Sequence, residues 1–160
     1  MITVALSTAI GAPASRVWRA LTDPAERVAW DERILGKVTL SKTSRSRTTT
    51  PDSDSDTPHH MHWRFRLGEI PLVMQDRFVS AQRHECLVSH ISIGSMQFDQ
   101  TLTLFSKDDE TGPHTRLAMK LVARNSIAVI GEFIPRLDVQ KIVIEYVDIT
   151  LRQIQKYCER

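Results

Sequence analysis

The chain has 160 residues, of which 41% are hydrophobic and 25% charged, and its formal net charge is +2. A chain of this length can bury roughly 68–70% of its unfolded surface without metals or disulfides, so we expect one globular domain spanning residues 1–160. The two cysteines, Cys86 and Cys158, lie far apart, which excludes a disulfide-rich fold and predicts reduced thiols in a cytoplasmic protein. No stretch approaches the roughly 20 apolar residues that a bilayer requires, so we expect no stable membrane insertion.

The first 30 residues predict one strand and two short helices. Residues 2–10 alternate apolar and small polar side chains, as a half-buried strand does. A first helix should follow over 13–22, with a proline in its opening turn. Asp23 then acts as an N-cap, with Pro24 at the first helical position of a second helix that runs to about Trp30.

Short alternating segments fill the middle of the chain, without helical patterns between them. Because parallel neighbours would each need a crossover of about a dozen residues, this order predicts an antiparallel sheet. The connections are short, except for a Ser/Thr/Asp/Pro-rich stretch at 43–58 that we interpret as a mobile polar loop insertion. The six predicted strands are 34–41, 60–67, 71–80, 85–93, 97–105 and 115–124.

A helical pattern ends the chain. Apolar residues recur at helical spacing from Val139 to Tyr157, which predicts a long C-terminal helix. Pro135 should begin this helix or kink it, because a proline removes a backbone hydrogen bond. Residues 126–134 should then form a preceding short helix or a bent first section.

One strand, two short helices, six strands and a long helix is the helix-grip order. The opening segment Ala12–Pro24 (APASRVWRALTDP), followed by Trp30, resembles the START-like (SRPBCC) superfamily, which includes the birch-pollen allergen family and bacterial polyketide cyclases/dehydrases. The resemblance implies an α+β helix-grip fold, in which a curved antiparallel sheet of about seven strands surrounds the C-terminal helix. It also implies an apolar cavity between the sheet and that helix.

Strand alternation predicts which side chains face this cavity. Each inward set is apolar, apart from Ser89 and Gln100. A buried amide without partners costs on the order of 1–3 kcal/mol, so these two residues either orient a ligand or hydrogen-bond within the protein. The other candidate lining residues are Trp30, Trp63, Phe65, Ile91, Phe98, Met119, Phe133 and Leu137.

The strand 71–80 has one charge on each face, Asp76 on one and Arg77 on the other. In bacterial aromatase/cyclases of the superfamily the corresponding strand presents an inward arginine. The resemblance implies this catalytic role for Arg77, with Val73 and Gln75 lining the same face. An inward guanidinium would stabilise an enolate as charge develops. The alternative places Arg77 on the outer face or in a pair with an acid.

Three functions remain open from the sequence. The first is binding of a lipid, aromatic or polyketide-like molecule in the cavity, which needs no catalytic residue and is favoured because no evident acid/base pair is present. The second is a polyketide cyclase/dehydratase that uses the same cavity, and the third is a surface-mediated interaction module. A homodimer is left open.

Cofactor, metal and nucleic-acid sites are not expected. His59, His60 and His62 have no acid or cysteine at ligand spacing, so we expect no metal site. The glycines are spread singly rather than in phosphate-binding loops, so we expect no cofactor. The basic residues are scattered rather than concentrated, which argues against a nucleic-acid partner.

Overall fold

The predicted strands pair into a seven-stranded antiparallel sheet in the order β1-β7-β6-β5-β4-β3-β2. The computed structural model describes residues 2–37, 60–124, 127–128 and 137–160. The strands of the sheet are β1 (Ile2–Ile10), β2 (Ile34–Lys37), β3 (Met61–Leu67), β4 (Ile70–Gln82), β5 (Cys86–Ile93), β6 (Met96–Asp109) and β7 (Gly112–Ala123). The helices are α1 (Ala14–Thr22), α2 (Pro24–Trp30) and α3 (Val139–Cys158).

The first two helices follow from their capping residues. The Asp23 carboxylate accepts a hydrogen bond from the backbone N–H of Ala25 at 2.9 Å, and Pro24 is the first residue of α2, as predicted. Pro13 lies at the N-cap of α1, one position earlier than expected. Since proline has no backbone N–H to donate, it is well tolerated at a helix start.

The segment before α3 differs from the expected short helix at two positions. Ile127–Ala128 forms strand β8, which pairs antiparallel with β9 (Leu137–Asp138). Its backbone hydrogen bonds therefore go to a neighbouring strand rather than along a helix. The rest of the predicted helix, Pro135 and the loop at 43–58 lie outside the described residues.

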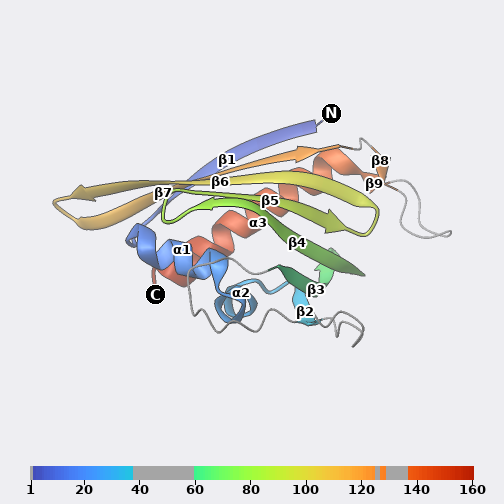
Figure 1. Cartoon of the computed structure of the whole chain (residues 1–160), viewed down its shortest axis with the longest axis horizontal. Coiled ribbons are helices and arrows are strands. Elements are labelled where there is room, and N and C mark those ends of the chain that lie inside the picture. The colour runs from blue at the N-terminus through green and yellow to red at the C-terminus, as the bar shows by residue number, and fades with distance from the viewer. Residues whose placement is uncertain (1, 38–59, 125–126, 129–136) are drawn as a thin grey trace.

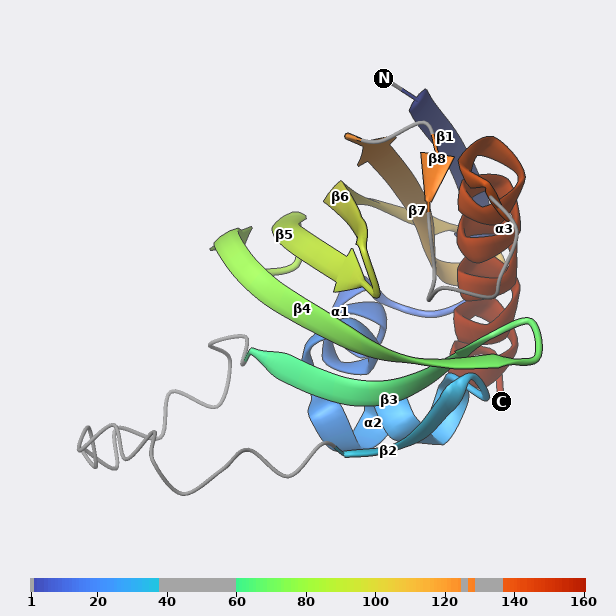
Figure 2. The same ribbon diagram turned by 90° about the vertical axis from the view of Figure 1, so that its right-hand side faces the viewer.

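Helix α3 lies along the inner face of the curved sheet, and α1 and α2 lie at one end (Figures 1 and 2). It contacts β1 and β7 as well as both short helices. Its buried stripe includes Val143, Val147 and Ile154, each 0% exposed. The Tyr146 ring reaches Phe65 on β3, with 6.1 Å between the ring centroids. One core cluster therefore joins the helices to strands across the sheet.

Two tight turns fix the pairing of the central strands. Gly68 has a φ of 61° in the β3–β4 turn, and Gly94 has a φ of 58° in the β5–β6 turn. Such positive values suit glycine, which has no Cβ to clash with the backbone. Each turn has two residues, since Leu67 pairs with Ile70 and Ile93 pairs with Met96. This register decides which side chains face α3.

The described residues show neither a disulfide nor a membrane-spanning helix. Cys86 and Cys158 are free thiols. Burial raises the pKa of Cys158 to about 11, so this thiol stays protonated and unreactive near neutral pH. Within the described ranges, no helix is long and apolar enough to cross a membrane.

Candidate functional site

Large apolar side chains form the inner wall of the sheet. Alternation along β3, β5, β6 and β7 places these residues on the face that α3 covers. The predicted facing of these strands is therefore confirmed. Each candidate on this wall is at most 2% exposed: Trp63, Phe65, Ile91, Phe98 and Met119.

Trp30 is also buried, at the end of α2. Its indole N–H donates to the carbonyl oxygen of Ala20 at 2.7 Å, so its polar atom holds α2 against α1. The guanidinium of Arg27 lies over its ring, 4.8 Å from the centroid. Of the other candidates, Phe133 lies outside the described residues, and Leu137 is described only as part of the backbone of β9.

Strand β4 has the opposite facing to the one expected from the family resemblance. Asp76 pairs with Met61 on β3 and with Ile91 on β5, and it shares their inner face. Arg77 therefore faces outward and is exposed. The prediction of an inward Arg77 is therefore wrong. So is the prediction that Val73 and Gln75 line the interior, since both lie on the outer face and are exposed.

Asp76 rather than Arg77 faces inward because a buried charge needs an oppositely charged partner. Both faces of this strand combine apolar residues with one charge, so alternation alone cannot choose between them. The inward Asp76 is 4% exposed, and its Oδ2 lies 3.9 Å from Nη1 of Arg27. An inward Arg77 would instead add a third buried cation beside Arg27 and Arg33, which are themselves buried.

Asp76, Ser89 and Gln100 form a polar group on the inner wall. Ser89 and Gln100 are directly paired on β5 and β6, and the Gln100 amide donates to the Ser89 hydroxyl at 3.4 Å. Burial raises the pKa of Asp76, while Arg27 and a hydrogen bond from Ser89 offset part of that effect. Both predicted polar exceptions are thus buried, and Ser89 hydrogen-bonds to the Asp76 carboxyl group.

Two buried polar atoms of this wall lack a hydrogen-bond partner among the described residues. They are the acceptor Oδ1 of Asp76 and the indole Nε1–H of Trp63. The two residues lie on adjacent strands of the same face, since Met74, two positions before Asp76, pairs with Trp63. The inner wall therefore has one unpartnered hydrogen-bond donor and one unpartnered acceptor among its described residues.

An ionic cluster next to this group was not predicted from the sequence. Asp31 lies between Arg27 and Arg33, with contacts of 2.9 Å and 2.8 Å. Burial disfavours the charged forms of Asp31 and Arg27, but the attraction between opposite charges outweighs this effect. The pKa of Asp31 is therefore lowered, and the pKa of Arg27 is raised. The only sequence signal was the spacing of Arg27 and Asp31, which suits an ion pair across one helical turn.

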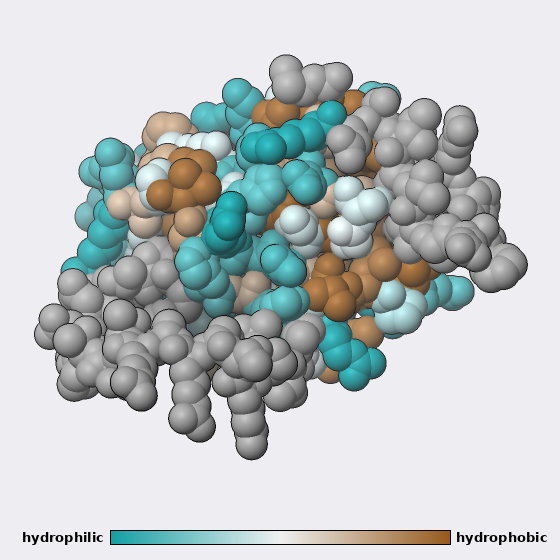
Figure 3. All heavy atoms as spheres, turned by 45° about the vertical axis from the view of Figure 1, so that its right-hand side comes forward, coloured by the Kyte–Doolittle hydropathy of each residue, from teal (hydrophilic) through white to brown (hydrophobic). Residues whose placement is uncertain are grey.

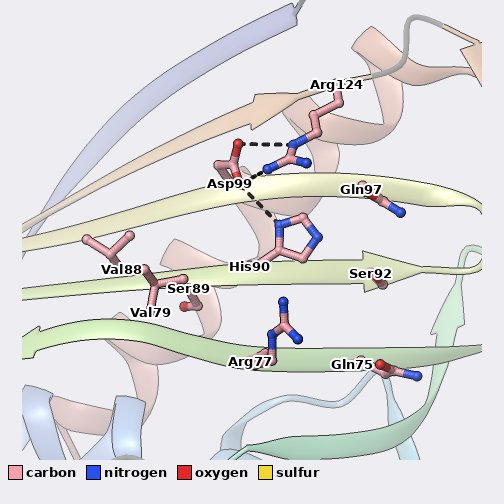
Figure 4. Close-up of a pocket in the computed structure, with 10 residues that line it drawn as sticks. All are labelled: Gln75, Arg77, Val79, Val88, Ser89, His90, Ser92, Gln97, Asp99 and Arg124. Carbon is pink, nitrogen blue, oxygen red and sulfur yellow. Dashed lines mark hydrogen bonds and ion pairs between the residues drawn. The ribbon is translucent and has the colours of Figure 1, made fainter.

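The opposite face of the sheet carries a groove with a volume of about 640 Å³. It runs over β4, β5 and β6, and Arg77, His90 and Asp99 lie across its floor (Figure 4). In the face seen in the space-filling view, hydrophilic side chains lie between hydrophobic patches (Figure 3). Asp76 faces the interior and Arg77 faces the groove, so the sheet separates these two side chains, whereas Ser89 belongs to the polar group and also lines the groove.

The histidines do not assemble a metal centre in the described part of the chain. The ring nitrogen Nδ1 of His60 accepts from the backbone N–H of Phe78 at 3.3 Å, and His62 lies on the outer face. His59 lies outside the described residues. No group of three or more His, Cys, Asp or Glu residues with metal-binding geometry occurs among those that the structure describes.

No protein-family model and no curated protein sequence match the chain. Solved structures do match it over almost its whole length. The Zhui aromatase/cyclase from Streptomyces sp. R1128 has a TM-score of 0.68 at 13% identity, covering 99% of this chain and 94% of that chain. A START superfamily protein from Mycobacterium smegmatis has a TM-score of 0.67 at 11% identity, covering 98% and 97%.

A plant protein shares the same architecture. Ginseng major latex-like protein 151 from Panax ginseng has a TM-score of 0.62 at 8% identity, covering 99% of this chain and 98% of that chain. At these identities the likeness concerns the fold. The chain has the same helix-grip α+β fold as these three proteins, and this confirms the architecture that the opening segment implied.

Proposed function

We propose that the protein binds a hydrophobic small molecule of lipid, aromatic or polyketide-like character between the sheet and α3. The observation that carries this proposal is the pair of unpartnered polar atoms on the inner wall, Nε1–H of Trp63 and Oδ1 of Asp76. Buried polar groups are normally hydrogen-bonded, and ligand sites are mostly apolar with a few placed polar groups. The similarity to the START superfamily protein supports the same function.

The two atoms favour a ligand that carries a hydroxyl group. A hydroxyl oxygen can accept from the Trp63 indole while its hydrogen is donated to Asp76. The apolar neighbours Phe65, Ile91 and Phe98 would cover the remainder of such a molecule. Its burial would contribute about 25 cal/mol per Å² of apolar area, so affinity would come from the wall and orientation from the two polar atoms.

The experiment begins with native mass spectrometry of freshly purified protein, beside the same sample denatured, to detect a retained small molecule. The protein is then titrated with 2-naphthol and with naphthalene, followed by fluorescence. We expect 2-naphthol to bind about tenfold more tightly, since one net hydrogen bond contributes about 1 kcal/mol or more. Asp76→Asn should weaken 2-naphthol binding, whereas the outward Arg77→Gln should not. Absence of both a retained molecule and saturable 2-naphthol binding would overturn the proposal.

A second candidate is polyketide cyclase/dehydratase chemistry at the same site. The observation that favours it is the raised pKa of the Asp76 carboxyl group, because perturbed acids of this kind serve in proton transfer. A carbon–carbon bond would form between an α-carbon, which loses its proton to water, and a carbonyl carbon, whose oxygen takes the proton of Asp76. Arg77 takes no part in this step.

The cyclase candidate is tested with a linear poly-β-ketone thioester. We expect cyclised product to form faster than in buffer, and Asp76→Asn to slow the reaction at least about 100-fold, the size of a typical general-acid contribution. Arg77→Gln serves as the control and should keep the wild-type rate. A reaction no faster than in buffer excludes this chemistry and leaves binding as the proposed function.

A further inference from the structure

The floor of the groove on the outer face includes polar side chains that lie side by side on β4, β5 and β6. Arg77 on β4 pairs with His90 on β5, and His90 pairs with Asp99 on β6. Cross-strand partners lie about 4.5–5.5 Å apart, so these three side chains stand next to one another on the face away from α3. Figure 4 shows the Arg77 side chain extending toward His90.

The charges in this row are only partly paired. The Asp99 carboxylate contacts Nδ1 of His90 at 3.1 Å and Nη2 of Arg124 at 3.2 Å. The hydrogen bonds from His90 and Arg124 lower the pKa of Asp99, so it is an anion near neutral pH. The Arg77 side chain makes no hydrogen bond or ion pair with any residue that the structure describes. The guanidinium of Arg77 therefore lies in the middle of the groove without a counter-ion among the described residues.

The two sides of Arg77 differ in chemistry. On one side the next row consists of Gln75, Ser92 and Gln97, whose amide and hydroxyl groups can donate or accept hydrogen bonds. On the other side lie Val79, which is 65% exposed, and Val88. A ligand anchored at Arg77 would thus meet an apolar surface in one direction and hydrogen-bonding groups in the other.

We propose that this groove binds a small organic anion through Arg77, with the short apolar part of the ligand on Val79 and Val88. The guanidinium presents a fixed fork of donors that matches the two oxygens of a carboxylate or phosphate. A volume of about 640 Å³ is in the range of small-molecule sites. Asp99 is held by His90 and Arg124, so it does not compete for Arg77.

The test is an NMR titration of the full ¹⁵N-labelled chain with hexanoate, phenyl phosphate and the neutral analogue 1-hexanol. The signals followed are the Nε–H of Arg77 and the side-chain amides of Gln75 and Gln97. We expect saturable shifts of these signals with an anion and none with 1-hexanol. The tighter of hexanoate and phenyl phosphate identifies a carboxylate or a phosphate as the preferred group. Shifts that fail to saturate with either anion would overturn the proposal.

Arg77→Gln removes the charge from an exposed position, and Arg64→Gln is its matched control. Arg64 is an exposed, outward arginine on β3 that pairs with Val73 and does not line the groove. We expect Arg77→Gln to weaken binding at least about tenfold and Arg64→Gln to leave it within about twofold. Equal losses in the two variants would indicate only the general positive field of this face, and wild-type binding by Arg77→Gln would place the anion elsewhere. Either result would contradict the proposed site.

Discussion

Arg33 holds Asp31 in a two-point ion pair, with Nε 2.8 Å from Oδ1 and Nη2 3.1 Å from Oδ2. The same guanidinium donates to the carbonyl oxygen of Tyr146 at 3.3 Å and to the hydroxyl of Thr150 at 2.8 Å. Arg33 precedes β2, whereas Tyr146 and Thr150 belong to α3. One buried side chain therefore ties the start of the sheet's edge strand to the helix that the sheet surrounds.

Asp31→Asn should be strongly destabilising. The substitution removes the only negative charge in contact with both Arg27 and Arg33 among the described residues. It leaves the buried Arg33 without a counter-ion and the buried Arg27 with only the more distant Asp76. Breaking a buried ion pair in this way costs about 3–5 kcal/mol. Urea denaturation at neutral pH, compared with wild type, measures the loss.

The exposed pair between Asp148 and Arg152 on α3 provides the control for this prediction. Because solvent screens exposed charges, Asp148→Asn should leave the urea midpoint nearly unchanged. The pKa of Asp31 is lowered in the folded chain, so its contribution is present above pH 3.8 and is lost as the pH falls through its folded-state pKa. An Asp31→Asn protein as stable as wild type would contradict the structural role of the cluster.

Asp76→Asn should become more stable relative to wild type as the pH rises. Burial raises the pKa of Asp76 above its ordinary 3.8 in the folded chain, and Arg27 offsets only part of this. The folded chain then binds the proton more tightly than the unfolded chain, so stability is lost as the pH rises from 3.8 through the folded-state pKa. Asparagine carries no charge to bury and avoids this loss.

Urea midpoints of both proteins at about pH 4 and about pH 7 measure the effect. We expect the two proteins to be similar at the lower pH and the variant to be more stable than wild type at the higher pH. Other titrating groups are common to both proteins, so the difference isolates Asp76. A variant that is less stable at pH 7 would show that the attraction to Arg27 outweighs the cost of burying this carboxylate.

Met74→Ala and Val73→Ala test the facing of β4 with two neighbouring residues. Met74 is 0% exposed and Val73 is 44% exposed. The first substitution should cost about 2–5 kcal/mol, because it leaves a cavity against α3, and the second less than about 0.5 kcal/mol. Chemical denaturation of both variants gives the comparison directly. Similar losses for the two would be inconsistent with the observed register.

The apolar inner wall of the sheet was predictable because it depends on a pattern of neighbouring residues within each strand. Period-two alternation in β3, β5, β6 and β7 identified Trp63, Phe65, Ile91, Phe98 and Met119 before any pairing was known. The polar exceptions Ser89 and Gln100 were equally visible, since a polar residue interrupts an apolar set. The burial of the ionic cluster was not predictable, because it depends on α3, and Arg33 contacts that helix at residues 113 and 117 positions away in the sequence.

The sequence by itself determined the three helices and the seven strands of the main sheet, the antiparallel pairing and the apolar inner faces, because each depends on nearby residues, turns and caps. It did not predict the short strands β8 and β9. Only the tertiary structure decided that Asp76 faces inward and Arg77 outward. Each face of β4 combines apolar residues with one charge, and the choice between the two faces depends on Arg27, which reaches Asp76 from another element. Burying a charge such as that of Asp76 is favourable only beside a charge of opposite sign. The tertiary structure places Arg27 there, and the sequence of β4 does not contain this information.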